Sequence, residues 1–282
     1  MATFYNQATL TYNGGSVISN VTSGEIVEVL SVTKTPVVSE YTADGDVTYA
    51  ISIVNTGVTE FSNLTLTDDL GQYTFGTLTL TPLDYVDGSV KYYINGTLQP
   101  TPAVTAGSPL TITGITVPGG GNALILYTAR ANSSAPPIGT GSVTNTASVT
   151  GDSVNISDSA TVTASLSPEL NIIKSVSPTT VVENGTVTYT FVLRNSGNTE
   201  AGTADNVSLT DTFDPILTGI TVTYNGTPWT EGVNYTYDET TGAFASVPGQ
   251  ITIPAATFTQ DVTTGMWTVT PGESVLTVTG TI

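Results

Sequence analysis

The chain has 282 residues, which is enough for two domains that each bury a core of their own. Five basic residues stand against 23 acidic ones, and the net charge of -18 excludes nucleic acids and anionic membrane surfaces as favoured partners. The chain lacks cysteine and histidine, so disulfide bonds are excluded and an enzyme with catalytic turnover is not expected.

The sequence has no pattern typical of a signal peptide, a membrane span or a metal site. No apolar run reaches the length of a membrane span, and Met1-Ala2-Thr3 lacks the basic and apolar residues of a signal peptide, so we expect no membrane insertion. Either a leader has been removed, or the protein is exported by a route that needs none. The acidic pairs do not match the spacing of a calcium loop, and we predict no metal and no cofactor.

Hydrophobic residues make up 39% of the chain and alternate with threonine, serine and asparagine through nearly all of it. A period of two is typical of half-buried strands, and no segment has the period of an amphipathic helix. Short runs rich in valine, isoleucine, threonine and tyrosine are separated by Asn-Gly, Gly-Gly, Asp-Gly and proline. This pattern predicts an all-β chain of Ig-like β-sandwich domains.

The first segment in chain order, residues 1–30, has the pattern of the end of a domain. Phe4–Thr11 and Val143–Thr150 share the pattern apolar-x-Asn-x-Ala-polar-apolar-Thr. In each copy a turn and a second alternating strand follow, and then a segment that bears a lysine, Lys34 or Lys174. The later copy closes one domain and leads into the next. We therefore predict that residues 1–30 close a domain of another molecule.

The remainder of the chain contains two tandem copies of one domain, which a comparison of the chain with itself makes visible. The second copy repeats three segments of the first at similar spacing. The matching pairs are Ser31–Pro36 with Ile172–Pro178, Asp46–Gly57 with Thr186–Gly197, and Asn63–Asp68 with Asn206–Asp211. Each copy then contains an Asn-Gly turn, at Asn95-Gly96 and Asn225-Gly226, which favours a hairpin with a type I′ turn.

The two copies differ in how they end. Residues 27–166 form a complete domain that finishes with the strands of 142–166, and residues 167–282 contain no counterpart of those strands. We expect the second domain to expose unpaired backbone groups and an apolar groove, which together form a template for an added strand. The arm of residues 1–30 supplies a suitable strand.

One face of this arm carries the side chains that would fill such a groove: Phe4, Ala8, Leu10 and Tyr12. The sequence thus predicts that the second domain is completed by the N-terminal strands of a neighbouring subunit, as in donor-strand complementation. Because donor and acceptor lie at opposite ends of the chain, the contact is heterologous. It propagates into a filament unless the rotation closes a ring, of which a domain-swapped dimer is the smallest example.

Strand alternation also indicates which polar side chains point inward. Three in each domain share a face with apolar neighbours two positions away: Lys34, Asp68 and Asn145 in the first, and Lys174, Asp211 and the arm residue Asn6 for the second. In an apolar core the pKa of an ammonium or a carboxylate moves toward the neutral form. A neutral amine is a nucleophile, and a protonated acid can help ammonia leave from an amide.

The repeated segments resemble the DUF11 family of Ig-like surface repeats, which implies an extracellular role in stalks or fibres. The chain order of lysine, acid and asparagine also resembles that of Gram-positive adhesin and pilin domains with isopeptide bonds. That resemblance implies a bond from Lys34 to Asn145 within a subunit, and a bond from Lys174 to Asn6 of the next subunit. Asp68 and Asp211 would transfer the protons. The alternative for each triplet is a buried, hydrogen-bonded Lys–Asp pair with a neighbouring asparagine.

The sequence therefore predicts a structural subunit of an extracellular filament, such as a pilus-like fibre or a spore or cell-surface appendage. Its main partner is a second copy of itself, added head to tail. The alternative is a cell-surface adhesin or stalk module that presents loops to a glycan or a host protein. Trp229 and Trp267 are candidates for such a binding face, although packing is the commoner use of an isolated tryptophan.

Overall fold

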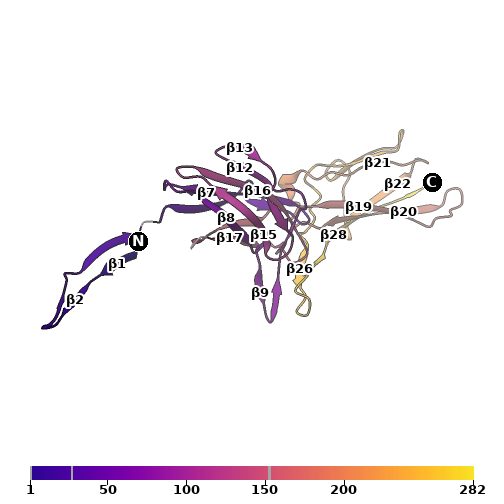
Figure 1. Cartoon of the computed structure of the whole chain (residues 1–282). Helices are drawn as coiled ribbons and strands as arrows, with labels where there is room; N and C mark the ends of the chain where they lie inside the picture. The colour runs from indigo at the N-terminus through magenta and orange to yellow at the C-terminus, as the bar shows by residue number, and fades with distance from the viewer. Residues whose placement is uncertain (1, 27, 152–153) are drawn as a thin grey trace.

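The structure is a computed structural model that describes residues 2–26, 28–151 and 154–282. An N-terminal arm precedes two β-domains that follow one another along the molecule (Figure 1). The described residues form β-strands and one short 3₁₀ turn, Thr203–Asp205, and contain no α-helix. The prediction of an all-β chain built from β-sandwich domains is confirmed.

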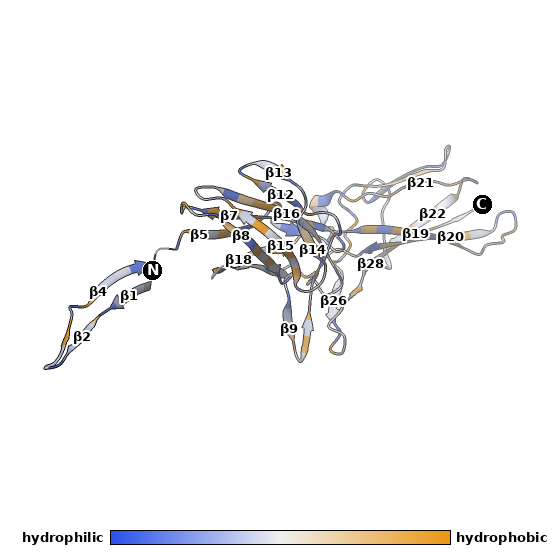
Figure 2. Ribbon diagram, viewed as in Figure 1, coloured by the Kyte–Doolittle hydropathy of each residue, from blue (hydrophilic) through white to orange (hydrophobic). Residues whose placement is uncertain are grey.

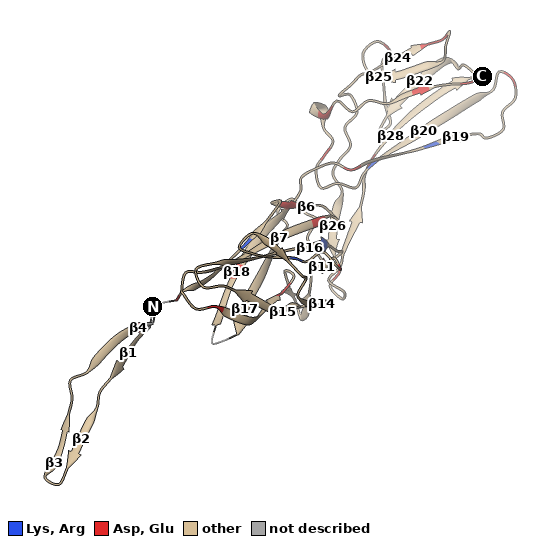
Figure 3. Ribbon diagram, turned by 45° about the horizontal axis from the view of Figure 1, so that its top comes forward, with Lys and Arg blue, Asp and Glu red and all other residues tan. Residues whose placement is uncertain are grey.

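The arm is a long two-stranded ribbon in two parts. β1 (Ala2–Asn6) pairs with β4 (Thr22–Ile26), and β2 (Thr9–Tyr12) pairs with β3 (Gly15–Ile18) at the tip. The ribbon projects from the end of the first domain that faces away from the second domain (Figures 1 and 3). Figure 3 also marks where the acidic and basic residues of the described chain lie along the ribbon.

The first domain is a sandwich of two sheets. One sheet has the order β13 (Thr97–Gln99), β12 (Lys91–Ile94), β16 (Asn122–Ala131), β7 (Asp46–Asn55) and β5 (Leu30–Pro36), with β11 (Leu83–Tyr85) also paired to β16. The other has the order β14 (Ala103–Thr105), β15 (Leu110–Val117), β8 (Phe61–Asp68), β17 (Ser142–Gly151), β18 (Val154–Ala164) and β6 (Glu40–Tyr41). Apolar side chains of alternate positions fill the space between the sheets.

The second domain repeats the first sheet and only part of the second. Its larger sheet has the order β19 (Leu170–Ser177), β20 (Thr186–Asn195), β28 (Gly272–Thr281), β22 (Thr218–Tyr224) and β23 (Thr227–Pro228). The facing sheet contains β21 (Thr210–Thr212), β25 (Ala243–Ser246) and β24 (Tyr235–Asp238). Apolar and polar residues alternate along the strands of both domains (Figure 2).

Both Asn-Gly hairpins have the predicted turn. The backbone φ is 48° at Asn95 and 77° at Gly96, and it is 48° at Asn225 and 78° at Gly226. Positive φ at both central residues defines the type I′ turn, whose twist matches that of the flanking strands. The hairpins follow as β12–β13 and β22–β23.

Two hairpins without counterparts in the other domain lie at the junction of the domains. β9 (Tyr73–Phe75) pairs with β10 (Leu78–Leu80) in the first domain, and β26 (Thr257–Gln260) pairs with β27 (Trp267–Thr270) in the second. The Gln260 side chain donates to the Tyr73 hydroxyl at 3.0 Å, and the Trp267 amide donates to the carbonyl of Ser133 at 2.8 Å. These bonds help fix the orientation of one domain on the other.

Candidate functional site: a buried lysine cluster and an open groove

Four polar side chains form one continuous chain of hydrogen bonds in the core of the first domain. Lys34 Nζ donates to Asp68 Oδ2 at 2.6 Å, and both side chains are fully buried. The Tyr127 hydroxyl donates to the same carboxylate oxygen at 2.7 Å. Asn145 Nδ2 in turn donates to the Tyr127 oxygen at 2.8 Å. The structure thus brings Lys34, Asp68 and Asn145 together, with Tyr127 between the acid and the amide.

The strands that carry this cluster come from both sheets. β5 and β16 supply Lys34 and Tyr127, and β8 and β17 supply Asp68 and Asn145. The Lys34 amide also donates to Asp158 Oδ2 on β18 at 2.7 Å, which ties the edge strand β5 to the opposite sheet. The cluster is therefore positioned by the sandwich itself and not by a loop.

Aromatic rings surround the ammonium group of Lys34. Its Nζ lies 4.7 Å from the centre of the Tyr49 ring and 5.8 Å from that of Tyr127. Attraction to a ring face partly replaces the water that the ammonium loses on burial. Two buried atoms of the site, the Tyr49 hydroxyl and Asn145 Oδ1, have no hydrogen-bond partner among the described residues. Such atoms are rare in protein cores.

Burial changes the proton affinities in this cluster. Burial lowers the pKa of Lys34, although the charge of Asp68 acts in the opposite direction. Burial also raises the pKa of Tyr127 well above its usual value, and the neighbouring Asp68 charge adds to this. The amine is thus shifted toward its neutral, nucleophilic form, while the phenol is held in its protonated form.

The pH dependence of stability follows from the Lys34 shift. Because the pKa of Lys34 is lower in the folded state, the unfolded state binds more protons between the folded value and 10.5. We expect the free energy of unfolding of an Asn145→Ala variant, in which Lys34 stays a free amine, to rise with pH over this interval. Above about pH 10 the unfolded tyrosines ionise, and stability falls again.

The measurement is urea unfolding of Asn145→Ala at several pH values between neutrality and pH 10. The matched control adds Lys34→Met, which removes the titrating amine and keeps a long apolar stem. The control should lose the rise with pH. A rise of equal slope in both proteins would show that another group is responsible.

The second domain holds a corresponding pair in a more open setting. Lys174 Nζ donates to Asp211 Oδ2 at 2.5 Å, and the two side chains are 42% and 17% exposed. The Lys174 ammonium lies 4.9 Å from the Tyr189 ring centre. The sequence-based expectation that Lys174 is enclosed in the core is not met in the isolated chain, because no strand covers β19 on this side among the described residues.

The two pairs also differ in their neighbours. β16 pairs Tyr127 with Tyr49, whereas β28 pairs Val278 with Tyr189, the counterpart of Tyr49. The second domain therefore has valine where the first has the hydroxyl that links the acid to the amide.

Asn6 does not lie with Lys174 and Asp211 in the structure. It is exposed on β1, and the hydrogen bonds found for residues 2–26 stay inside that ribbon. The four plug residues behave alike, since Phe4, Leu10 and Tyr12 are more than half exposed and Ala8 is also exposed. The arm is not seated in its own second domain.

An apolar groove of about 330 Å³ opens on the second domain beside the Lys174–Asp211 pair. β19 contributes Leu170 and Ile172, which are 47% and 54% exposed. Val207, Leu209, Ile251 and Ile253 also belong to the apolar lining. In the first domain the same position is filled by β17, which pairs with β8, and by β18, which packs against β5.

The arm has the hairpin register of β17 and β18. With Asn6 aligned on Asn145, Tyr12 pairs with Gly15 as Gly151 pairs with Val154. The correspondence holds through Thr9, which pairs with Ile18. Beyond that point the return strand of the arm carries one extra residue, because Asn6 pairs with Thr22.

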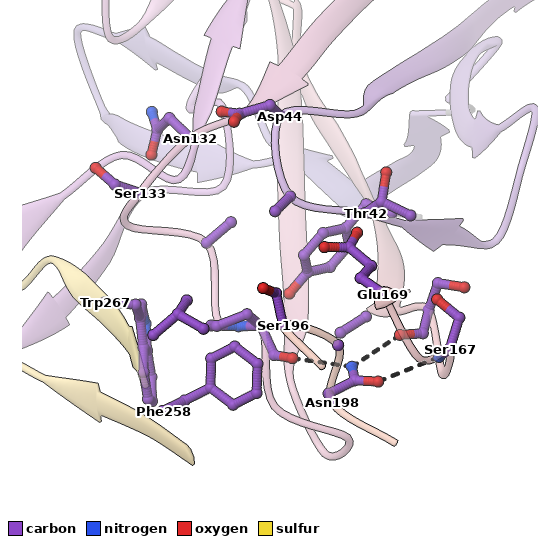
Figure 4. A pocket seen from close by; sticks show the side chains of 18 of the residues that line it. Thr42, Asp44, Asn132, Ser133, Ser167, Glu169, Ser196, Asn198, Phe258 and Trp267 are labelled. Carbon is purple, nitrogen blue, oxygen red and sulfur yellow. Dashed lines mark hydrogen bonds between the residues drawn. The ribbon is translucent and has the colours of Figure 1, made fainter. Parts of the chain in front are cut away.

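A pocket of about 500 Å³ lies between the two domains (Figure 4). Phe258 and Trp267 of the β26–β27 hairpin line one side, and Asn132 and Ser133 of the first domain lie nearby. Asn198 holds the floor together by donating to the carbonyls of Pro137 and Ser165 at 2.9 and 2.8 Å. Trp267 Nε1 is buried without a hydrogen-bond partner among the described residues.

The described residues contain neither a cluster of metal-binding side chains nor a membrane-spanning helix. No group of three or more histidine, cysteine, aspartate or glutamate side chains is arranged to hold a metal ion in residues 2–26, 28–151 and 154–282. Over the same residues, no helix has the length and apolar composition needed to span a membrane.

The chain has no match among family models or curated protein sequences, so the resemblance to DUF11 repeats depends on the segments quoted above. Solved structures do resemble it. The major pilin subunit of Bacillus cereus is 13% identical with a TM-score of 0.37, over 96% of this chain and 73% of the pilin.

Two further structures give similar values. The pilus backbone of Streptococcus pneumoniae is 13% identical with a TM-score of 0.35, over 86% of this chain and 55% of the other. The collagen-binding domain of a Staphylococcus aureus adhesin is 12% identical with a TM-score of 0.30, over 50% of this chain and 99% of the other. The chain is thus similar to pilin subunits and to an adhesin domain.

Proposed function

We propose that the protein is the structural subunit of an extracellular filament in which the arm of one copy completes the second domain of the next. One observation carries this proposal. The tip of the arm, from Thr9 to Ile18, has the hairpin register of β17–β18, and the second domain has an open apolar groove where β17 and β18 lie in the first domain.

The first domain supplies a template for how the arm would sit. β17 pairs Ala147 with Asp68 and Val149 with Leu66. Transferred to the second domain, this register places Ala8 opposite Asp211 and Leu10 opposite Leu209. Asn6 would then occupy the position that Asn145 has in the cluster of the first domain, and would lie on the side of Lys174 and Asp211.

The energetics favour such an exchange between molecules. An isolated two-stranded ribbon is marginally stable in water, and the apolar side chains of the arm and of β19 are largely exposed. Each buried methylene contributes about 0.8 kcal/mol. Insertion would cover both surfaces and add a ladder of backbone hydrogen bonds to the open sheet.

The junction between the domains gives a second reason to expect an end-to-end filament. The Thr56 amide bonds to the carbonyl of Val29 just before β5, and the Ser196 amide bonds to the carbonyl of Glu169 just before β19, both at 2.8 Å. A seated arm would therefore enter the following domain with the same local geometry. Val58, which corresponds to Asn198 at the observed junction, is 98% exposed and would face the preceding subunit.

Covalent locking is the second part of the proposal. In the first domain, Lys34 Nζ attacks Asn145 Cγ, the new amide forms, and Nδ2 leaves as ammonia. Asp68 accepts protons from the Lys34 ammonium, which loses two in becoming an amide nitrogen; one of them leaves with the ammonia and the other stays on Asp68. Lys174, Asp211 and the Asn6 of the next subunit would react in the same way, and so join the subunits. Each bond lowers the mass by about 17 Da.

The test of strand insertion compares two substitutions on adjacent arm positions. Leu10→Glu places a carboxylate in the apolar groove, which is costly without a partner, and should abolish filaments in electron micrographs. Thr11→Glu is the matched control. It adds the same charge at the counterpart of Thr150, which is exposed on β17, and should leave filaments intact.

Other results would contradict this assembly. Equal loss of filaments with the two substitutions would show that the two faces of the arm have the same surroundings, which contradicts insertion into an apolar groove. Wild-type particles of uniform dimeric mass in light scattering would favour a closed domain-swapped dimer over a filament.

A second candidate function is that of an adhesive binding module, and the pocket between the domains favours it. Phe258 and Trp267 form an aromatic surface beside polar side chains, as carbohydrate sites often do. Both tryptophans of the chain lie in the second domain, so saturable quenching of tryptophan fluorescence by a glycan would support this function. A monomeric wild-type protein that binds a ligand would favour it over the filament.

A further inference from the structure

In the part of the chain that the structure describes, the Tyr127 hydroxyl is the one group that joins the acid to the amide of the first domain. It donates to Asp68 Oδ2 at 2.7 Å and accepts from Asn145 Nδ2 at 2.8 Å. Asp68 itself bonds to the Lys34 amine and, through Oδ1, to the amide of Leu70. Among the described residues, no hydrogen bond joins Asp68 directly to Asn145.

This arrangement raises a question about the leaving group. Ammonia can depart from the tetrahedral adduct only if Nδ2 receives a proton. Asp68 is the acid of the cluster, but it is separated from Nδ2 by the tyrosine oxygen. The hydroxyl spans that separation and is placed to carry a proton across it.

We propose that Tyr127 is a catalytic proton relay in the formation of the Lys34–Asn145 bond, an inference that depends on the covalent part of the proposed function. Attack by the neutral amine converts Nδ2 from a planar amide nitrogen to a tetrahedral one with a free lone pair. The Tyr127 hydroxyl then turns its hydrogen toward Nδ2. Protonated Asp68 donates to the tyrosine oxygen, so the chain of hydrogen bonds reverses its direction.

Every proton is accounted for over the steps of this reaction. Asp68 takes the first proton from the Lys34 ammonium, which frees the amine for attack on Cγ. It passes this proton to the Tyr127 oxygen as the hydroxyl passes its own to Nδ2, and the Cγ–Nδ2 bond breaks to release ammonia. Asp68 then takes the second proton from Nζ and ends protonated beside the new amide.

The surroundings of Tyr127 suit a relay that carries no net charge. Its side chain is completely buried, and burial together with the Asp68 charge raises its pKa, so that it stays a neutral phenol throughout. Val278 stands at the equivalent position in the second domain. The bond to Asn6 would therefore form without a relay, and more slowly than the bond inside the subunit.

The experiment follows ammonia loss by intact mass after refolding. Full-length protein with Leu10→Glu, which keeps it monomeric, is dissolved from inclusion bodies in guanidinium and diluted into buffer. Tyr127→Phe retains the ring and removes the hydroxyl. We expect it to lose ammonia at least about 10²-fold more slowly, the lower range for a general acid.

Tyr92→Phe is the matched control. Tyr92 is also buried in the first domain, and its hydroxyl also donates to and accepts from the protein, at Thr116, but it lies outside the cluster. This variant should react at the parent rate. Equal rates for the parent and Tyr127→Phe would overturn the relay alone, whereas a parent protein that never loses ammonia would overturn the isopeptide proposal itself.

If Tyr127→Phe does not fold, the parent protein still decides the question. When two protons move in one step, a plot of the reaction rate against the D₂O fraction of the solvent is curved. We expect such a curve. A linear dependence would indicate a single transferred proton and would contradict the relay.

Discussion

Filaments of an Asn6→Ala variant are expected to assemble and then to separate into monomers in boiling detergent, whereas wild-type filaments persist as a ladder of covalent multimers. The substitution removes the carboxamide that Lys174 would attack but leaves Leu10 and the strand backbone that would fill the groove. Only the covalent step is lost. The measurement is denaturing electrophoresis of filaments first seen by electron microscopy.

The matched control is Asn145→Ala, which makes the same change at the aligned position inside the subunit. It should retain the ladder. Each subunit should lack the Lys34–Asn145 bond, so that it does not lose the ammonia released by that bond, and it should unfold more readily. A ladder that survives Asn6→Ala would place the intermolecular bond elsewhere. Loss of the ladder in Asn145→Ala together with a persistent ladder in Asn6→Ala would indicate that Asn145 and not Asn6 joins the subunits.

Strand alternation was the most informative signal in the sequence. A period of two predicts the β-sandwich, and the same parity predicts that Lys34, Asp68 and Asn145 point between the sheets. The structure buries all three side chains. The Asn-Gly turns were equally predictable, because few other residue pairs accept positive φ at two adjacent positions.

The alternation of side chains along a strand indicates which face of the sheet a side chain points to, but not which residue it contacts across the core. Tyr127 was missed for this reason, although it lies on the inner face of β16, two positions from the buried Ile125. A tyrosine within an otherwise apolar alternation is the signal that could have identified it, since a buried hydroxyl requires a partner. Asp158, whose carboxylate accepts a hydrogen bond from the Lys34 backbone amide, was missed for the same reason.

Lys174 illustrates a different limit of sequence analysis. Its neighbours along the strand are apolar, so parity places it inward, yet its side chain is 42% exposed. An inward direction produces burial only when a second layer is present. In the described chain that layer is open beside β19, so burial of Lys174 depends on what fills the groove.

The same acid substitution in the two domains should therefore have very different costs. In a monomer with Leu10→Glu and Asn145→Ala, both lysines remain free amines. Asp68→Leu leaves the fully buried Lys34 ammonium without its partner, which typically costs about 3–5 kcal/mol. Asp211→Leu breaks a pair that water reaches, and exposed pairs contribute about 0–1 kcal/mol.

Hydrogen exchange of peptides from β7 and β20 measures the two domains separately within one chain. We expect the loss of protection after Asp68→Leu to be confined to the first domain, and little change in the second after Asp211→Leu. Arm insertion would remove this asymmetry, because it would bury Lys174 as β17 and β18 bury Lys34. In filaments of Asn6→Ala, Asp211→Leu should become strongly destabilising, and an unchanged small cost there would contradict insertion of the arm beside this pair.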